Sequence, residues 1–209
     1  MSRPAVLATA ALLALAGCTR HPTAAIPDTG PRVQLAALTV APEDTGAHYA
    51  RADWGDWARH GQCDTREQAL AAQGTGVMAD PQCRPVCPAA VPPCWTSPYD
   101  GVTTGDPGVL QIDHLVPLAE AQQSGARDWT TARRHAYYND PANLVAVTIH
   151  ANTSKGDRDP GQWRPPARDS WCAYAVGWIA VKGTYGLNVD PAERDALGAM
   201  LAYCPAPTP

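Results

Sequence analysis

The sequence predicts an α+β domain in which two short β runs and a following helix form a small core, with further helices packed around it and disulfides stapling it. Three observations predict this class. Two β-type runs, over residues 109–116 and 143–148, are separated by helical segments, and the second leads directly into a short helix. Two longer helical patterns follow towards the C-terminus. The cysteines outside the N-terminal leader form an even set, which suggests disulfides.

Composition bounds the kinds of protein that this chain can be. Its 209 residues are 45% hydrophobic and 17% charged, which favours one domain with a core and argues against wholesale disorder. The formal net charge of −4, with 16 Lys and Arg together, excludes the global basic field of non-specific nucleic-acid binders. Any contact with nucleic acid must therefore be local. The chain has 21 Pro, 17 Gly and no Phe, which indicates many loops and large apolar groups that are chiefly Trp and Tyr.

The first 17 residues are expected to be a lipoprotein signal peptide. Arg3 precedes a small and apolar run over 5–16, which is too short to cross a bilayer as a helix. Leu15-Ala-Gly-Cys18 resembles the lipobox of bacterial lipoproteins, which implies lipidation of Cys18 and a membrane anchor on the extracytoplasmic face of the envelope. Plain secretion is the alternative. The Pro, Ala and Thr of residues 18–50 predict a flexible tether, so that the domain itself spans 51–209.

Six cysteines remain when Cys18 is set aside, and an even set in an exported chain indicates disulfides. They are Cys63, Cys83, Cys87, Cys94, Cys172 and Cys204. Six cysteines allow fifteen pairings. Short separation favours Cys87 with Cys94, and two adjacent C-terminal helices favour Cys172 with Cys204, which leaves Cys63 with Cys83. A zinc site at Cys83, Cys87 and Cys94 is the competing interpretation, but the sequence has no paired CxxC knuckles to accompany it.

Local signals predict the helices, which are expected over residues 65–72, 118–124, 129–138, 149–155, 169–185 and 191–203. Asp64 or Thr65 is the N-cap of the first. The stretch 81–98 is dense in Pro and Cys and is expected to be irregular. The last helix has a well-formed start, with Asp190 as N-cap and Glu193 completing a capping box.

Three motifs lie in order between residues 111 and 157: Gln111-Ile-Asp-His-Leu-Val-Pro-Leu-Ala-Glu-Ala121, Asn139-Asp-Pro-Ala-Asn-Leu-Val-Ala-Val147 and Ala151-Asn-Thr-Ser-Lys-Gly-Asp157. With them the chain resembles the HNH (ββα-metal) nucleases, specifically the secreted branch related to the C-terminal domain of GmrSD-type restriction endonucleases. The resemblance implies an HNH core over about 109–157, braced by C-terminal helices over 169–204. It also implies a metal-dependent endonuclease that hydrolyses phosphodiester bonds of DNA, with RNA as an alternative, outside the cytoplasm.

The resemblance implies a role for each of five polar residues. Asp113 and Asn152 carry over as oxygen ligands of one divalent cation, Mg²⁺ or Mn²⁺. His114 carries over as general base, since an unperturbed imidazole is largely neutral near pH 7. Asn143 carries over as the residue that positions this imidazole by accepting a hydrogen bond from its second ring nitrogen. Lys155 is expected on the same helix face as Asn152, where it would bind phosphate.

Other interpretations stay open for the same residues. Taken singly, each of the five is explained by a cap, a turn or a satisfied core position. A second function, from a different class, is a non-catalytic surface lipoprotein that binds through exposed aromatic side chains on an HNH scaffold. The tryptophans in loop-like segments are Trp54, Trp57, Trp95 and Trp163. Nucleic acid and a membrane are the implied partners, and no protein partner is implied.

Overall fold

Two antiparallel strands and the helix that follows them hold the centre of the fold. The computed structural model describes residues 30–90 and 93–205. Strand β7 (Leu110–His114) pairs along its whole length with β8 (Leu144–Thr148), so that Leu110 lies opposite Thr148 and His114 opposite Leu144. Helix α5 (Ile149–Lys155) starts directly after β8 because the Thr148 side chain accepts a hydrogen bond from the Ala151 backbone N–H. The expected order of strand, strand and helix is confirmed.

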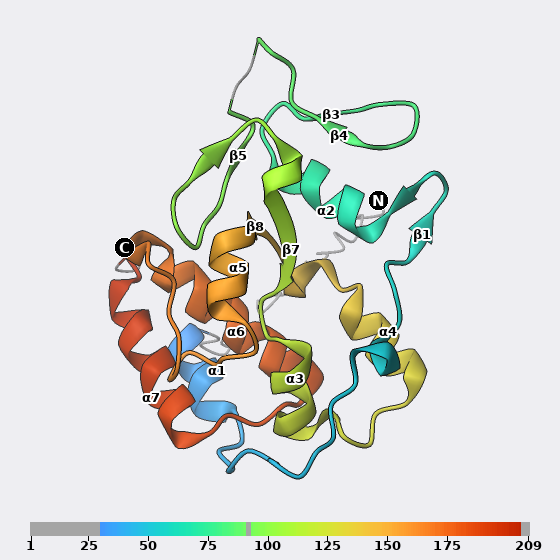
Figure 1. The fold of residues 1–209 in the computed structure, drawn as a ribbon. Helices are drawn as coiled ribbons and strands as arrows, with labels where there is room; N and C mark the ends of the chain where they lie inside the picture. Colours follow the sequence, from blue (N-terminus) through green and yellow to red (C-terminus); the bar gives the residue numbers. More distant parts are fainter. Residues whose placement is uncertain (1–29, 91–92, 206–209) are drawn as a thin grey trace, which may run out of the picture.

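The other elements surround this centre (Figure 1). The remaining helices are α1 (Pro31–Ala37), α2 (Thr65–Gln73), α3 (Leu118–Ala121), α4 (Thr131–Tyr138), α6 (Trp171–Tyr185) and α7 (Pro191–Met200). Short strands form three more antiparallel pairs: β1 (Arg59–His60) with β2 (Cys63–Asp64), β3 (Met78–Ala79) with β4 (Pro85–Val86), and β5 (Trp95–Thr96) with β6 (Thr103–Thr104). The result is a mixed α and β domain with small sheets, as predicted. Within the described ranges no helix combines the length and apolarity that crossing a bilayer requires.

The two faces of the β7–β8 sheet have different neighbours. Leu110, Ile112, Leu144 and Ala146 alternate along the strands and are buried in one apolar cluster with residues of α2 and β5. Since successive side chains of a strand point to opposite faces, Asp113 lies on the other face, where α5 packs. The pleat therefore turns Asp113 towards the helix that carries Asn152, as a ββα arrangement requires.

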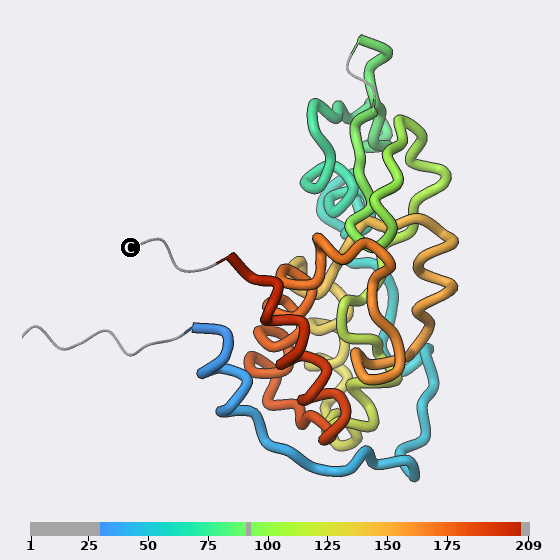
Figure 2. The backbone as a smooth tube through the Cα atoms, turned by 90° about the vertical axis from the view of Figure 1, so that its left-hand side faces the viewer, coloured from blue at the N-terminus to red at the C-terminus, as the bar shows by residue number. Residues whose placement is uncertain are grey.

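The C-terminal helices form a second layer with the N-terminal segment. Figure 2 shows α1 beside α6 and α7 at one end of the molecule, with the small sheets at the other. Leu35 of α1 is buried, and Val40 forms a parallel β-bridge with Val189. The flexible tether expected over 18–50 is therefore wrong for residues 30–50. The partners of this segment lie some 150 residues away in sequence, so local composition does not show them. Residues 18–29, the signal peptide over 1–17 and the lipidation site Cys18 lie outside the described residues.

Three disulfides staple the fold. They join Cys63 with Cys83, Cys87 with Cys94, and Cys172 with Cys204, which confirms the two pairs that the sequence favoured and the pair that remained. The zinc interpretation is thereby wrong, because a metal requires thiolates and these sulfurs are bonded to one another.

The expected exposed tryptophans are not exposed. Trp54 and Trp95 are 1% and 2% exposed, and Trp57 and Trp163 are half-buried. Trp95 also donates its indole N–H to the Leu70 carbonyl at 2.8 Å. In a chain without Phe these rings fill the core, so the binding function that relied on them loses its basis.

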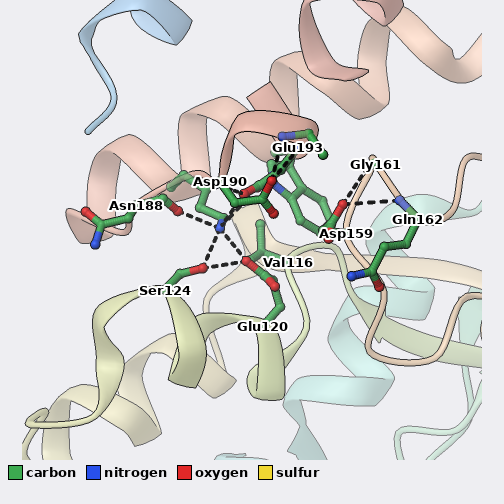
Figure 3. Close-up of polar contacts among 12 residues, drawn as sticks. Val116, Glu120, Ser124, Asp159, Gly161, Gln162, Asn188, Asp190 and Glu193 are labelled. Carbon is green, nitrogen blue, oxygen red and sulfur yellow. Dashed lines mark hydrogen bonds and ion pairs between the residues drawn. The ribbon is translucent and has the colours of Figure 1, made fainter. Parts of the chain in front are cut away.

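A buried ionic network ties α3, α6 and α7 together (Figure 3). The Lys182 ammonium is fully buried and pairs with Glu120 at 2.5 Å and Glu193 at 3.0 Å. It also donates to the Ser124 hydroxyl and to the Asn188 carbonyl. Burial raises the pKa of Glu193 to about 7, while the Lys182 charge opposes this rise. These side chains therefore stabilise the packing of α3, α6 and α7.

Candidate functional site

A cavity of about 430 Å³ opens where β7 ends. Asp113, His114 and Asn152 all line it. Asp113 and His114 leave the strand on opposite faces, yet both reach the cavity, because β7 stops at His114 and the cavity surrounds this end. Three of the five predicted site residues are thus brought together, from β7 and α5.

Asp113 is held by two hydrogen bonds and an ion pair. Tyr99 donates its hydroxyl to Oδ2 at 2.7 Å, and the Lys155 ammonium lies 3.0 Å from Oδ1 and 2.8 Å from Oδ2. Burial raises the pKa of Asp113, and the Lys155 charge opposes this rise. Since two carboxylate oxygens offer about four lone-pair positions, these two donor groups leave acceptor capacity on the carboxylate.

Lys155 does not face the cavity as a phosphate ligand. Its side chain is fully buried, and its ammonium also donates to the His114 carbonyl at 2.9 Å. The predicted phosphate-binding role is therefore wrong. On α5, Lys155 shares the core-facing side with Ala151, four residues earlier, while Asn152 stays partly exposed. The buried ammonium instead joins the Asp113 carboxylate to the backbone at the end of β7.

His114 is held as a neutral imidazole. Its Nε2 lies 2.9 Å from the Tyr138 carbonyl oxygen, which can only accept, so Nε2 carries the hydrogen and Nδ1 keeps its lone pair. The ring stacks on Trp57 at a centroid distance of 5.7 Å and an interplanar angle of 11°. Burial lowers the pKa of His114 to about 4, so the ring is neutral throughout the physiological range.

Asn143 holds the chain beside His114 and not its ring. The Asn143 carbonyl accepts from the Leu115 N–H at 2.8 Å. Its side-chain Oδ1 accepts from the Val116 N–H at 2.9 Å, and its Nδ2 donates to the Val116 carbonyl. The expected hydrogen bond from Asn143 to the imidazole is therefore wrong, because the Tyr138 carbonyl takes that place. Asn143 fixes the path of the backbone that leaves β7.

Asn152 lines the cavity with a side-chain amide that is held by one hydrogen bond. Its Nδ2 donates to Gln111 Oε1 at 2.7 Å, which orients the amide. Among the residues that the structure describes, Oδ1 has no hydrogen-bond partner. One carboxylate and one amide oxygen on a shared cavity are hard donors of the kind that Mg²⁺ and Mn²⁺ prefer, so the residues present fit a divalent cation.

A second acidic group lies elsewhere and shares no residue with the cavity. One oxygen of each of Glu43, Asp159 and Asp190 lies within 4.8 Å of the others. Asp190 caps α7 by accepting from the Glu193 N–H, and Asp159 accepts from the Gly161 N–H (Figure 3). Backbone capping thus accounts for two of these three carboxylates.

Sequence reasoning missed several residues of the cavity and its support. Tyr99 and Tyr138 contact Asp113 and His114, although neither belongs to a motif that the sequence analysis used for the site. The other missed residues come from segments distant in sequence; they are Arg51, Trp57 and Arg66. No periodicity marks them, because they approach the site only through tertiary packing.

Comparisons with known proteins agree with this architecture. The model of the GmrSD restriction endonucleases, C-terminal domain, matches residues 94–200, which include β7, β8 and α5. An uncharacterized secreted protein of Arthroderma benhamiae is 43% identical over 173 residues, covering 81% of this chain and 82% of that protein. No solved structure gave a significant match. The chain therefore belongs to the family of the GmrSD restriction endonuclease C-terminal domain.

Proposed function

We propose that this protein is a metal-dependent endonuclease of HNH type, with β7, β8 and α5 as its ββα core. Its substrate is the phosphodiester backbone of DNA, with RNA as the alternative. One observation carries the proposal: Asp113, His114 and Asn152 line a single cavity, and the hydrogen bond from His114 Nε2–H to the Tyr138 carbonyl leaves Nδ1 as the basic ring nitrogen. Family membership supports a nuclease and a nucleic-acid substrate.

His114 is the general base in this proposal. A nucleophilic water within hydrogen-bond reach of Nδ1 gives up its proton to the imidazole as it attacks phosphorus, while the bond from phosphorus to one sugar oxygen breaks and that oxygen takes up a proton from solvent water. The Tyr138 carbonyl stabilises the imidazolium that forms, because Nε2–H already donates to it at 2.9 Å. Trp57 keeps the ring in one orientation by stacking on it. A base that is already oriented loses no rotational freedom during the reaction.

Asp113 and Asn152 would hold one divalent cation, Mg²⁺ or Mn²⁺, through a carboxylate and an amide oxygen. When bound, such an ion would neutralise charge on the scissile phosphate and on the leaving oxygen. Tyr99 and Lys155 fix the orientation of the Asp113 carboxylate, and Gln111 fixes the Asn152 amide. Asn143 supports the site indirectly by holding the chain after His114.

The protein acts outside the cytoplasm in this proposal. Three disulfides suit an oxidising compartment, and the relative from Arthroderma benhamiae is described as secreted. We propose residues 1–17 as the signal peptide and Cys18 as the lipid attachment site. Mass spectrometry of the chain exported by a bacterial host tests both: a diacylglyceryl group on an N-terminal Cys18 is expected, and an unmodified mature chain would contradict the anchor.

Cleavage of plasmid and single-stranded DNA by the oxidised protein tests the nuclease. We expect cutting with Mg²⁺ or Mn²⁺, none with EDTA, and a loss of about 10²- to 10⁴-fold in His114→Ala. Asp113→Ala and Asn152→Ala should weaken metal binding as well as cutting. The matched control is Arg194→Gln, which removes an exposed charge of α7 and should cut as the parent does. Full activity of a clean His114→Ala preparation would refute the assignment of the base.

A further inference from the structure

We propose that Arg51 and Arg66 bind backbone phosphates that flank the scissile bond. The 3₁₀ turn with Arg51 and helix α2 with Arg66 would then form the part of the cavity that binds the substrate. The inference rests on the proposed nuclease function and deepens it. Both arginines line the cavity together with Asp113, His114 and Asn152. Both also lie outside residues 94–200, the range that the family model matches.

Arg51 is held in place by the residue that also holds the base. Its guanidinium donates to the Tyr138 hydroxyl at 2.8 Å and lies 5.3 Å from the centre of that ring. The Tyr138 carbonyl meanwhile accepts from His114 Nε2. Trp54, at the end of the same 3₁₀ turn (Arg51–Trp54), is 1% exposed and anchors the turn in the core. The positive charge is thus fixed beside His114, whose pKa it helps to lower.

Arg66 is presented from the first turn of α2. The helix starts with a capping box in which Asp64 and Glu67 bond each other's backbone N–H groups. The neighbouring Cys63 is tied to Cys83 by a disulfide. The Arg66 side chain is half-buried, and among the described residues it has no hydrogen-bond or ion-pair partner. A positioned guanidinium without a partner is available to an anion.

The charges of the cavity favour an anionic ligand. Four of the described arginines outside the cavity pair with carboxylates, namely Arg84, Arg127, Arg134 and Arg194, and the others do not. Neither cavity arginine does so within the described residues, since the hydrogen-bond partner of Arg51 is a neutral hydroxyl. The Asp113 charge is balanced by Lys155, which leaves Asp157 as the opposing carboxylate of the lining. A chain of net charge −4 thereby acquires a locally positive cavity.

Phosphate is the anion that this geometry suits. A guanidinium offers a planar fork of N–H donors that matches two phosphate oxygens, and most contacts of proteins to nucleic acids go to the backbone. A cavity of about 430 Å³ is in the size range of sites for whole small-molecule ligands, so it accommodates more than one phosphate group. We therefore place the scissile phosphate at Asp113, His114 and Asn152, and a flanking one at the arginines.

Binding without metal provides the first test. Fluorescence anisotropy would follow a labelled single-stranded DNA oligonucleotide in EDTA over a range of salt concentrations. Arg51→Gln and Arg66→Gln should each weaken binding about tenfold and lower the slope of log Kd against log salt by about 0.7. Arg51→Lys should keep the slope, because it keeps the charge. Arg194→Gln removes the same charge far from the lining and should leave both quantities unchanged.

Cleavage of two substrates locates the phosphate that is bound. For an oligonucleotide, Arg66→Gln should raise KM more than it lowers kcat. For bis(4-nitrophenyl) phosphate, which has a single phosphate, Arg66→Gln should lose much less of its kcat/KM than it loses on the oligonucleotide. Circular dichroism of each variant checks that it is folded. If Arg51→Gln unfolds, Arg66→Gln still tests the phosphate site, and Arg51→Lys tests position 51 with the positive charge kept.

Each outcome has one meaning. Unchanged Kd and salt slope in both Gln variants would overturn the inference while leaving the nuclease intact. An equal loss on the single-phosphate substrate would overturn the flanking position. If the parent binds the oligonucleotide through both arginines but does not cut it with any metal that is tested, the phosphate site stands and the proposed hydrolysis fails.

Discussion

Replacing Lys155 by Met tests whether this ammonium is a structural partner of Asp113. Met keeps most of the apolar volume of the side chain and removes the charge. The parent ammonium contacts both Asp113 oxygens and the His114 carbonyl at 2.8–3.0 Å, and its side chain is fully buried. Breaking such a pair by removing one partner leaves a buried charge uncompensated, so the expected loss in free energy of unfolding is about 3–5 kcal/mol near pH 7.

The sign of the pH dependence follows from Asp113. Burial raises the pKa of this carboxyl and Lys155 opposes the rise, so without Lys155 the pKa rises further. A group whose pKa is raised on folding contributes stability that is present below its unfolded pKa and is lost as the pH rises through its folded pKa. The destabilisation of Lys155→Met should therefore shrink as the pH falls towards about 4.

Urea unfolding of the oxidised protein, followed by Trp fluorescence, measures this loss as a shift in midpoint at constant slope. Adding Asp113→Asn to Lys155→Met should recover about 2 kcal/mol or more, because the buried charge is then gone. The control is Arg194→Met, whose exposed pair with Asp195 should be worth less than about 1 kcal/mol. A loss below about 1 kcal/mol for Lys155→Met would refute the buried pair and restore the surface role.

Three further predictions concern the pH dependence of activity, the buried Lys182 network and the Cys172–Cys204 disulfide. Because burial lowers the pKa of His114 to about 4, the acid limb of kcat/KM at saturating metal should lie near pH 4, and a limb near 6.5 would contradict the buried base. Lys182→Met should lower the free energy of unfolding at pH 7 by about 3–5 kcal/mol, measured by thermal or urea unfolding. The loss should be smaller in acid, where Glu193 is protonated, and the activity per folded molecule should not change. Replacing both Cys172 and Cys204 by Ser should cost about 3–4 kcal/mol for their separation of 32 residues, and an unchanged urea midpoint would contradict this.

Local signals sufficed for most of the elements. Asp64 with Glu67 and Asp190 with Glu193 form the capping boxes at the starts of α2 and α7, because a cap depends only on residues three apart. Strand periodicity likewise placed β7 and β8 within two residues of their expected ends. For residues 30–50 the local signals gave the wrong prediction of a flexible tether. The helix in this segment is stabilised by contacts with α6 and α7 and not by its own composition.

For the site, motif order identified the residues but not their contacts. Asp113, His114 and Asn152 reach one cavity, while Asn143 and Lys155 support it from within the core. The i, i+3 spacing of Asn152 and Lys155 allows a shared helix face, yet only the packing of α5 on the sheet decides which of the two is buried. The hydrogen-bond partner of His114 is a backbone carbonyl, which every residue possesses, so no side-chain pattern could have named Tyr138.

The sequence by itself determined the family, the strand–strand–helix order, the set of disulfide cysteines and the polar residues of the motifs. These follow from short-range spacing, which the chain carries without folding. Only the tertiary structure decided the burial of Lys155 against Asp113, the low pKa of His114, and the arrival of Arg51 and Arg66 at the cavity. Burial and charge proximity depend on which distant segments pack together, and that is a property of the whole folded chain.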